Sequence, residues 1–287
     1  MKQIGILANP TIEGIGDAIG HFVSLVTSKG FSVLLSDELE EVYEGNGFAY
    51  LPVGDLISKV DIVVALGGDG NLLRAASLVQ DLGTPILGVN LGRLGFLTGA
   101  DPGEFEEGLD RLLQDSYEVE ERMALVARLG DRTAFALNEI VIERSVTARQ
   151  IQVKAWISDT SLSSFFGNGL IVATPTGSTG YNLSAGGPVI HPTMKAIVVT
   201  PICPHSLTLR PMVVPADQPI TVQTLAAHSD TMLTADGLTV CSMKPEDQVV
   251  VRPAETPVRL INLHGLPFYD VLRQKLNWSR DRRELKE

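Results

Sequence analysis

The sequence is poor in cysteine and contains no long apolar run. Its two cysteines, Cys203 and Cys241, lie outside any Cys-X-X-Cys motif, so neither a disulfide framework nor a zinc ribbon is expected. Glycine, proline or charged residues interrupt the apolar stretches well before the roughly 20 residues of a membrane-spanning helix. We therefore expect two free thiols, a cytoplasmic location and no membrane partner.

Positive charge is also scarce. The 287 residues include 23 Lys and Arg against 34 Asp and Glu, a formal net charge of −11. Such a chain repels phosphate backbones, which argues against nucleic acid as a partner. Apolar residues make up 44% of the chain, which is enough for a packed core. The length predicts about two domains.

The first part of the chain alternates between strand and helix patterns. A continuous β-branched run at 61–66 is typical of a strand buried on both faces, and the segment 36–60 is read as a mobile acidic loop. This alternation predicts a parallel sheet covered by helices. The expected strands are 4–8, 31–35, 61–66 and 85–89, and the expected helices are 17–29, 72–82 and one starting at Asp101.

From about Tyr117 the pattern changes to short strands separated by Pro and Gly. It predicts a mostly-β domain at 117–264, while 1–116 and 265–287 form the α/β domain, to which a helix at Phe268–Leu276 returns. The expected strands are 124–129, 134–143, 150–157, 170–173, 196–200, 220–224, 247–251 and 258–262.

The strongest local motif is a glycine-rich loop between a buried strand and a helix, Gly67-Gly68-Asp69-Gly70-Asn71. Glycines allow the backbone to approach a phosphate, and a helix N-terminus supplies N–H donors. A carboxylate repels phosphate, so Asp69 is explained best if it accepts a proton from a hydroxyl being phosphorylated. The alternative is a tight turn in which Asp69 caps the helix.

A second glycine pattern, at 14–20, resembles a dinucleotide fingerprint. Its last gap is one residue too long, and five residues separate it from the preceding strand, whereas the true fingerprint opens its helix directly after the strand. We therefore do not favour hydride-transfer chemistry.

A third cluster is rich in hydroxyl groups and glycine and spans 174–188. Ser178, Thr179, Tyr181 and Ser184 could face one ligand, and hydroxyls beside an aromatic ring suit a nucleoside. The alternative is a capped helix and loop. No Gly-X-Ser-X-Gly motif indicates a nucleophilic serine.

Five motifs together resemble the NAD kinase family: the loop at Gly67–Gly70, GVNLGRLGFLT at 88–98, Asn138-Glu139, TPTGSTGYNLSAGGP at 174–188 and ICPHSLTLRP at 202–211, with FYDVLRQKLNWS at 268–279 near the end. The resemblance implies ATP-dependent phosphorylation of the adenosine-ribose 2′-hydroxyl of NAD to give NADP. It also implies Mg²⁺ or another divalent metal that arrives with ATP, a β-rich dinucleotide-binding domain, and a homo-oligomer, tetramer or dimer.

The resemblance further implies roles for residues that match its motifs. Asp69 would be the proton acceptor. The residues implied near the ATP phosphates are Gly67, Gly68, Asn71 and Arg74. The residues implied in the dinucleotide site are Asp69, Gly70, Asn138, Glu139, Arg149, Phe166, Asn168, Thr179, Gly180, Tyr181, Asn182, Leu183 and Ser184. His205 is interpreted as a structural histidine.

Three departures from the family pattern concern the dinucleotide site. Asn168 stands where the family usually has Asp, and Phe166 stands where a basic residue is frequent. In Asp236-Gly237-Leu238, Leu238 stands where a Gln is frequent. They put substrate contacts in doubt more than phosphoryl transfer, and they leave open the preference between NAD and NADH and between ATP and polyphosphate. The alternatives are a lipid or sugar kinase that shares the Gly-Gly-Asp-Gly motif and a non-catalytic NAD(P)-binding protein.

Overall fold

The chain folds into two compact units, each described here by itself. The computed structural model describes residues 2–45, 47–92, 95–97, 102–145, 150–225, 231–263 and 267–278. Unit 1 comprises Met1–Glu121 with Val258–Glu287, and unit 2 comprises Arg122–Pro257. The sequence predicts that the second crossing, at which the chain returns from the β-rich domain to the α/β domain, lies between residues 264 and 265. In the structure it precedes β19 (Val258–Asn262), because this strand pairs in parallel with a strand of unit 1 through Leu260 and Ile86.

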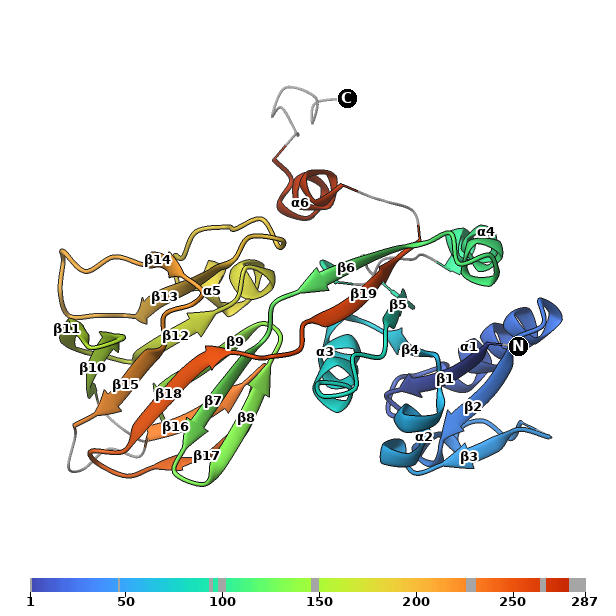
Figure 1. Cartoon of the computed structure of the whole chain (residues 1–287), viewed down its shortest axis with the longest axis horizontal. Coiled ribbons are helices and arrows are strands. Elements are labelled where there is room, and N and C mark those ends of the chain that lie inside the picture. Colours follow the sequence, from blue (N-terminus) through green and yellow to red (C-terminus); the bar gives the residue numbers. More distant parts are fainter. Residues whose placement is uncertain are drawn as a thin grey trace. The chain divides into compact units, whose positions relative to one another are not determined.

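Unit 1 is built on a seven-stranded sheet with the order β3-β2-β1-β4-β5-β19-β6, and its N-terminal strands pair in parallel (Figure 1). This arrangement confirms the predicted parallel sheet. Besides β19, the strands of this sheet are β1 (Gln3–Ala8), β2 (Ser32–Ser36), β3 (Ala49–Leu51), β4 (Ile62–Gly67), β5 (Ile86–Asn90) and β6 (Glu118–Arg122).

The strand order places a topological switch point between β1 and β4. From β1 the chain builds outward through β2 and β3 on one side, and from β4 it builds through β5 on the other. The carboxyl ends of these parallel strands lie at one edge of the sheet, and ligands of open α/β sheets bind there, beside the switch point. The loops after β1 and β4 therefore flank the expected binding crevice.

Helices cover both faces of this sheet. The apolar stripe of α1 (Ile15–Ser28) packs with α4 (Pro102–Leu113) over one face, in a core that includes Ile4 and Ile6 of β1. Gly5, which lies between them in β1, faces the opposite side of the sheet, where the side chain of Leu56 in α2 (Val53–Lys59) packs against it. Helix α3 (Asp69–Leu78) contacts β4, β5 and β1. Helix α6 (Phe268–Leu276) has the bounds that the sequence predicts.

The prediction of a mobile acidic loop at 36–60 is wrong. This segment contains the 3₁₀ helix η1 (Asp37–Leu39), the strand β3 and the helix α2. Leu39 and Leu56 are fully buried, so apolar side chains spaced among the acidic residues anchor the segment to the sheet. The high density of Asp, Glu and Gly hid these short elements.

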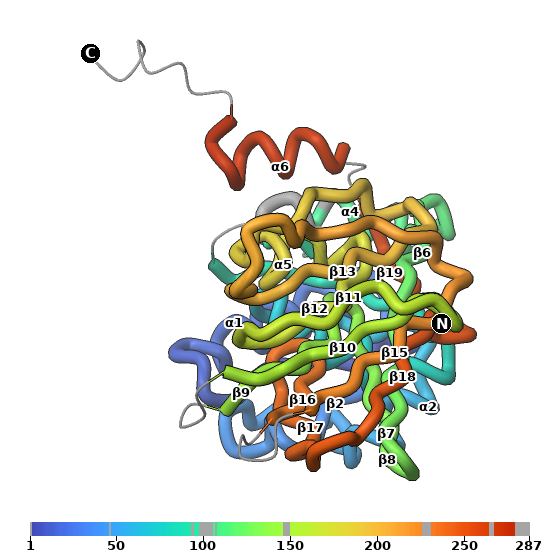
Figure 2. Tube along the Cα trace, turned by 90° about the vertical axis from the view of Figure 1, so that its left-hand side faces the viewer, coloured from blue at the N-terminus to red at the C-terminus, as the bar shows by residue number. Residues whose placement is uncertain are grey.

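Unit 2 consists of two six-stranded antiparallel sheets with the orders β11-β10-β15-β18-β7-β8 and β14-β13-β12-β9-β16-β17 (Figure 2). A shared core joins them, and β12 is buried along its whole length. The strands of unit 2 are β7 (Leu125–Leu129), β8 (Arg132–Ala136), β9 (Glu139–Arg144), β10 (Ile151–Ile157), β11 (Thr160–Gly167), β12 (Gly169–Ala173), β13 (Ala196–Ile202), β14 (Met212–Pro215), β15 (Ile220–Thr224), β16 (Thr231–Ala235), β17 (Leu238–Met243) and β18 (Gln248–Pro253).

The mostly-β character of this unit is confirmed, but the sequence underestimates the number of strands. The predicted strand at 134–143 is two strands, β8 and β9, joined at Leu137-Asn138. The sequence did not predict strands β11, β14, β16 and β17 of this unit, nor β6 of unit 1. In β11 the cause is visible, because this edge strand is rich in Ser and mostly exposed, which leaves little apolar alternation to recognise. Among the described residues, no helix has the length and apolar character needed to cross a membrane.

Candidate functional site

The Asp69 loop lies at the carboxyl edge of the sheet, beside the switch point. Strand β4 ends at Gly67 and α3 begins at Asp69, with Gly68 at the N-cap position. The Asp69 carboxylate accepts hydrogen bonds from the backbone N–H groups of Phe96 at 2.9 Å and Leu97 at 3.1 Å, which follow the neighbouring strand β5. Asp69 therefore does not cap its own helix. Its carboxylate is held by two amides of another segment.

The glycines of this loop leave its backbone accessible. Gly67 has φ = +141°, a conformation that residues with a side chain rarely adopt. A Cβ atom added at Gly68 or Gly70 would meet no atom within 4 Å. The first turn of α3 also has backbone N–H groups without helical acceptors. The loop can therefore bring backbone donors against an anion, as the sequence predicts.

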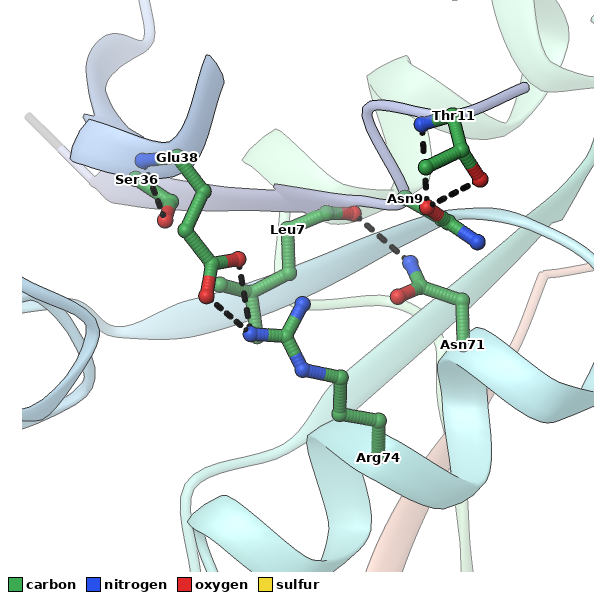
Figure 3. Close-up of polar contacts among 7 residues, drawn as sticks. All are labelled: Leu7, Asn9, Thr11, Ser36, Glu38, Asn71 and Arg74. Carbon is green, nitrogen blue, oxygen red and sulfur yellow. Dashed lines mark hydrogen bonds and ion pairs between the residues drawn. The ribbon is translucent and has the colours of Figure 1, made fainter.

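Asn71 and Arg74 are placed differently from one another on α3 (Figure 3). The buried Asn71 amide donates to the carbonyl of Leu7 at 2.9 Å and of Leu66 at 3.1 Å, and so joins the ends of β1 and β4. The Arg74 guanidinium donates from Nη2 to both Glu38 carboxylate oxygens, at 2.5 and 2.7 Å. Because this ion pair is half-exposed, it contributes only about 0–1 kcal/mol to stability.

In unit 2, one carboxylate organises the turn between β8 and β9. Asp236 accepts the backbone N–H groups of Leu137 and Asn138, each at 2.8 Å, and of Glu139 at 3.1 Å. It has φ = +48°, a left-handed conformation that few residues besides Gly, Asn and Asp adopt. The sequence places the segment Asp236-Gly237-Leu238 near the dinucleotide site but predicts no role for Asp236 itself. The following Gly237 was the available signal, since Asp-Gly marks a tight hairpin.

Two buried acceptor atoms near this turn have no partner among the described residues: Asn138 Oδ1 and Glu139 Oε2. Burial and the nearby Asp236 charge raise the pKa of Glu139 to about 7, although a hydrogen bond from the Tyr181 backbone lowers it. Unpaired buried acceptors are costly. A ligand that donates hydroxyl or N–H groups here would satisfy both atoms.

The hydroxyl-rich cluster divides into structural and accessible residues. Asn182 is fully buried; its amide nitrogen donates to the carbonyls of Ser178 and Pro188, each at 3.0 Å, and its oxygen accepts from Thr200 at 2.6 Å. Ser178 is also fully buried and is bonded to both backbone groups of Ile190. These two side chains therefore hold the segment together, so the expectation that Ser178 faces a ligand is wrong.

The accessible residues of this cluster lie on η2 (Thr176–Thr179) and α5 (Tyr181–Ser184). Thr179 and Leu183 are half-buried, while Tyr181 and Ser184 are exposed. A Cβ atom at Gly180 would lie 3.0 Å from Glu139 Oε2, and one at Gly177 would overlap the Asn138 carbonyl at 2.1 Å. The two glycines thus let this segment approach the β8–β9 turn, and the structure brings Asn138, Glu139 and residues 179–184 together.

Two of the three departures from the family pattern, Phe166 and Asn168, lie around the start of β12, and the third, Leu238, begins β17. The Asn168 side-chain oxygen accepts a hydrogen bond from Nε of Arg144 at 3.1 Å. Phe166 is 53% exposed, and its carbonyl accepts the backbone N–H of His205. The His205 ring lies 2.6 Å from the Gln150 amide. Arg149 and Asp101 lie outside the described residues.

The described residues contain no group of three or more His, Cys, Asp or Glu side chains that could hold a metal ion. Cys203 and Cys241 are free thiols.

Protein-family models match most of the chain. The model of the ATP-NAD kinase N-terminal domain matches residues 53–117, and that of the ATP-NAD kinase C-terminal domain matches residues 137–263. The chain is 41% identical to an NAD kinase of Geotalea daltonii, with 97% of this chain and 99% of the relative covered.

Two solved structures resemble the fold. An NAD kinase from Archaeoglobus fulgidus in complex with ATP has a TM-score of 0.78 and 26% identity, with 96% of this chain and 98% of that chain covered. Yeast NADH kinase complexed with NADH has a TM-score of 0.87 and 24% identity, with 98% of this chain and 89% of that chain covered. At that identity, the second likeness concerns the fold.

The raised pKa of Glu139 predicts a pH-dependent effect of the substitution Glu139→Gln. Below the ordinary pKa of 4.5, the carboxyl is protonated in both the folded and the unfolded chain. Between 4.5 and about 7 the folded chain binds more protons, so Glu139 destabilises the fold increasingly, by up to about 3 kcal/mol. The variant should therefore gain stability over the wild type as the pH rises from 5 to 8.

Thermal unfolding at pH 5 and pH 8 measures this gain. Glu255→Gln, which changes an exposed carboxylate of the same unit, is the control. A gain from Glu139→Gln that is equal at the two pH values would show that Glu139 is already ionised at pH 5.

Proposed function

This chain belongs to the ATP-NAD kinase family, and we infer that it catalyses the ATP-dependent phosphorylation of NAD to NADP. The observation that carries this conclusion is the family match over nearly the whole chain. Asp69 and the accessible glycine loop supply the chemistry. The acceptor is the 2′-hydroxyl of the adenosine ribose. The test is the formation of NADP by the purified protein supplied with NAD, ATP and Mg²⁺.

Asp69 is the proton acceptor of this reaction. A carboxylate has about four lone-pair positions, and two accept the N–H groups of Phe96 and Leu97. The remaining positions can accept the 2′-hydroxyl. As the ribose oxygen bonds to the γ-phosphorus, the bond to the β–γ bridging oxygen breaks, ADP leaves and the hydroxyl proton passes to Asp69. Phosphoryl transfer depends mainly on positioning and electrostatics, and the amide pair supplies that positioning.

The donor phosphates bind at the switch point, against Gly67, Gly68 and the first turn of α3. The open space at Gly68 supports this placement. Asn71 contributes by joining β1 to β4 beneath the loop, and Arg74 supplies positive charge. Mg²⁺ enters as part of the ATP substrate and neutralises phosphate oxygens, since Mg²⁺ in such sites is held largely by the phosphates.

NAD binds against the β8–β9 turn. Asn138 Oδ1 and Glu139 Oε2 accept hydrogen bonds from its hydroxyl or N–H groups, which removes the cost of two buried unpaired acceptors. The nucleoside part of NAD contacts Thr179, Gly180, Tyr181, Leu183 and Ser184. Asn182 acts indirectly, by fixing that segment. Gly70, Phe166, Asn168 and Arg149 complete the proposed dinucleotide contacts.

The protein acts in the cytoplasm as a homo-oligomer, a tetramer or a dimer. Support comes from the apolar edge of one sheet of unit 2. Met212 and Val213 on the edge strand β14 are each 43% exposed, and Leu207 in the preceding segment is 93% exposed. Apolar groups on an unpaired strand favour association.

The first prediction from this proposed function concerns Asp69→Asn. Turnover should fall by about 100-fold or more, which is the scale for a positioned acid–base group, while the fold and NAD affinity are retained, although the Asn oxygen can accept only one of the two N–H bonds. Asp55→Asn, which alters the first turn of α2 in the same unit, should leave turnover intact. Steady-state kcat and KM decide the matter. Unchanged kcat would reduce Asp69 to an anchor of the segment at 95–97.

A second prediction concerns nicotinamide charge. If position 168 faces the nicotinamide, Asn168→Asp should tighten NAD more than NADH by about tenfold, roughly 1.4 kcal/mol, because only the oxidised ring is positive. The wild type should discriminate poorly between them. Asn168→Ala loses the Arg144 contact, which an Asp would keep, and adds no charge, so it should change both affinities equally. Equal shifts with Asn168→Asp would show that the position does not sense this charge.

The third prediction concerns assembly. Light scattering at micromolar concentration should give a multiple of the 30.9 kDa chain mass, and Val213→Lys should lower it. Leu238→Lys, at the opposite edge strand β17 and 71% exposed in the wild type, should not. A monomeric wild type would refute the proposal.

A further inference from the structure

The ion pair between Arg74 and Glu38 lies at the edge of the sheet where we place the donor phosphates. Glu38 follows the carboxyl end of β2, and Arg74 projects from the helix that follows β4. Because β1 lies between these strands in the sheet, the pair spans the end of β1, past Leu7 (Figure 3). It therefore stands beside the switch point.

Only part of the guanidinium is engaged by Glu38. Nη2 donates hydrogen bonds to both Glu38 carboxylate oxygens. The Nε and Nη1 atoms have no hydrogen-bond partner within the part of the chain that the structure describes. Arginine holds phosphate through two parallel N–H groups. The pair is half-exposed, and such ion pairs are weak. A phosphate group can thus compete with Glu38 for Arg74 at low cost.

Positive charge is rare in the segment Phe31–Gly92. From Phe31 to Gly92 the chain carries two basic residues, Lys59 and Arg74, against nine Asp and Glu. Lys59 ends α2, just before β4 begins, and so lies toward the opposite edge of the sheet. In this part of the chain, Arg74 is therefore the cation available to a phosphate at the switch point, and Glu38 occupies it.

We propose that Glu38 is a specificity-determining residue that restricts access of metal-free polyphosphate anions to Arg74. This proposal rests on the proposed function, which places the donor phosphates at this edge. A linear triphosphate without metal has to displace Glu38 and also meets its negative charge. In MgATP the metal cancels two of the phosphate charges, so the same carboxylate opposes binding less.

Tripolyphosphate, the bare triphosphate chain of ATP, is the appropriate probe. Its affinity is measured by titration calorimetry without Mg²⁺ and without NAD. Glu38→Gln should tighten binding about five- to tenfold, because it removes both the competing ion pair and a repelling charge. Glu40→Gln, a loss of the same charge two residues away, is the matched control and should change affinity less than about threefold.

A double-mutant cycle with Arg74→Gln separates competition for Arg74 from a general charge effect. In the Arg74→Gln background, Glu38→Gln should gain no more than Glu40→Gln does. In turnover assays, Glu38→Gln should lower the KM for MgATP by a smaller factor than it tightens tripolyphosphate binding, since the metal offsets part of the phosphate charge.

Several results would overturn the proposal. Glu38→Gln could match the control, or weaken tripolyphosphate binding because Glu38 merely orients Arg74. Its effect could persist without Arg74, or the KM for MgATP could shift as much as the affinity for tripolyphosphate. A wild-type protein that forms no NADP would instead contradict the proposed function, and the calorimetric cycle would still report on Glu38.

Discussion

The two hydrogen bonds between the Asp69 carboxylate and backbone amides are the contact on which the proposed phosphoryl-transfer site depends. It exists because β4 and β5 are parallel neighbours, so the segments that follow them leave the sheet at the same edge. The amides hold both carboxylate oxygens, and an acid–base group is effective only when it is positioned in this way. Gly68 and Gly70, on either side of Asp69, border open space, because a Cβ atom added at either would meet no atom within 4 Å.

In unit 2, a carboxylate also binds backbone N–H groups of another segment, and there it stabilises a turn. Asp236 also gathers backbone N–H groups with its carboxylate, and it thereby fixes the turn that carries Asn138 and Glu139. The cost appears at Glu139, whose pKa is raised by burial and by the Asp236 charge. A group kept at such a cost in the ligand-free chain is explained if the dinucleotide repays it with hydrogen bonds.

The acidic character of the chain gives each cation at the proposed phosphate-binding edge a large role. Arg74 contacts Glu38 directly, and several further carboxylates follow Glu38 in the sequence. Repulsion of this kind opposes bare polyanions and is reduced when a metal accompanies the phosphates. The same net charge that argues against nucleic acid as a partner therefore also bears on the choice of phosphate donor.

The sequence by itself determined the fold class, the family, the glycine loop with its aspartate, and the helix at Phe268–Leu276, because these depend on local periodicity and contiguous motifs. It failed where order comes from distant partners. Leu39 and Leu56 bury an acidic segment against the sheet, and Ser-rich β11 is a strand because β10 pairs with it. Ser178 and Asn182 matched a binding motif, yet Ile190 and Thr200 engage their side chains. Only the tertiary structure could decide these roles, since a hydroxyl or amide bonds to whichever group the fold brings beside it.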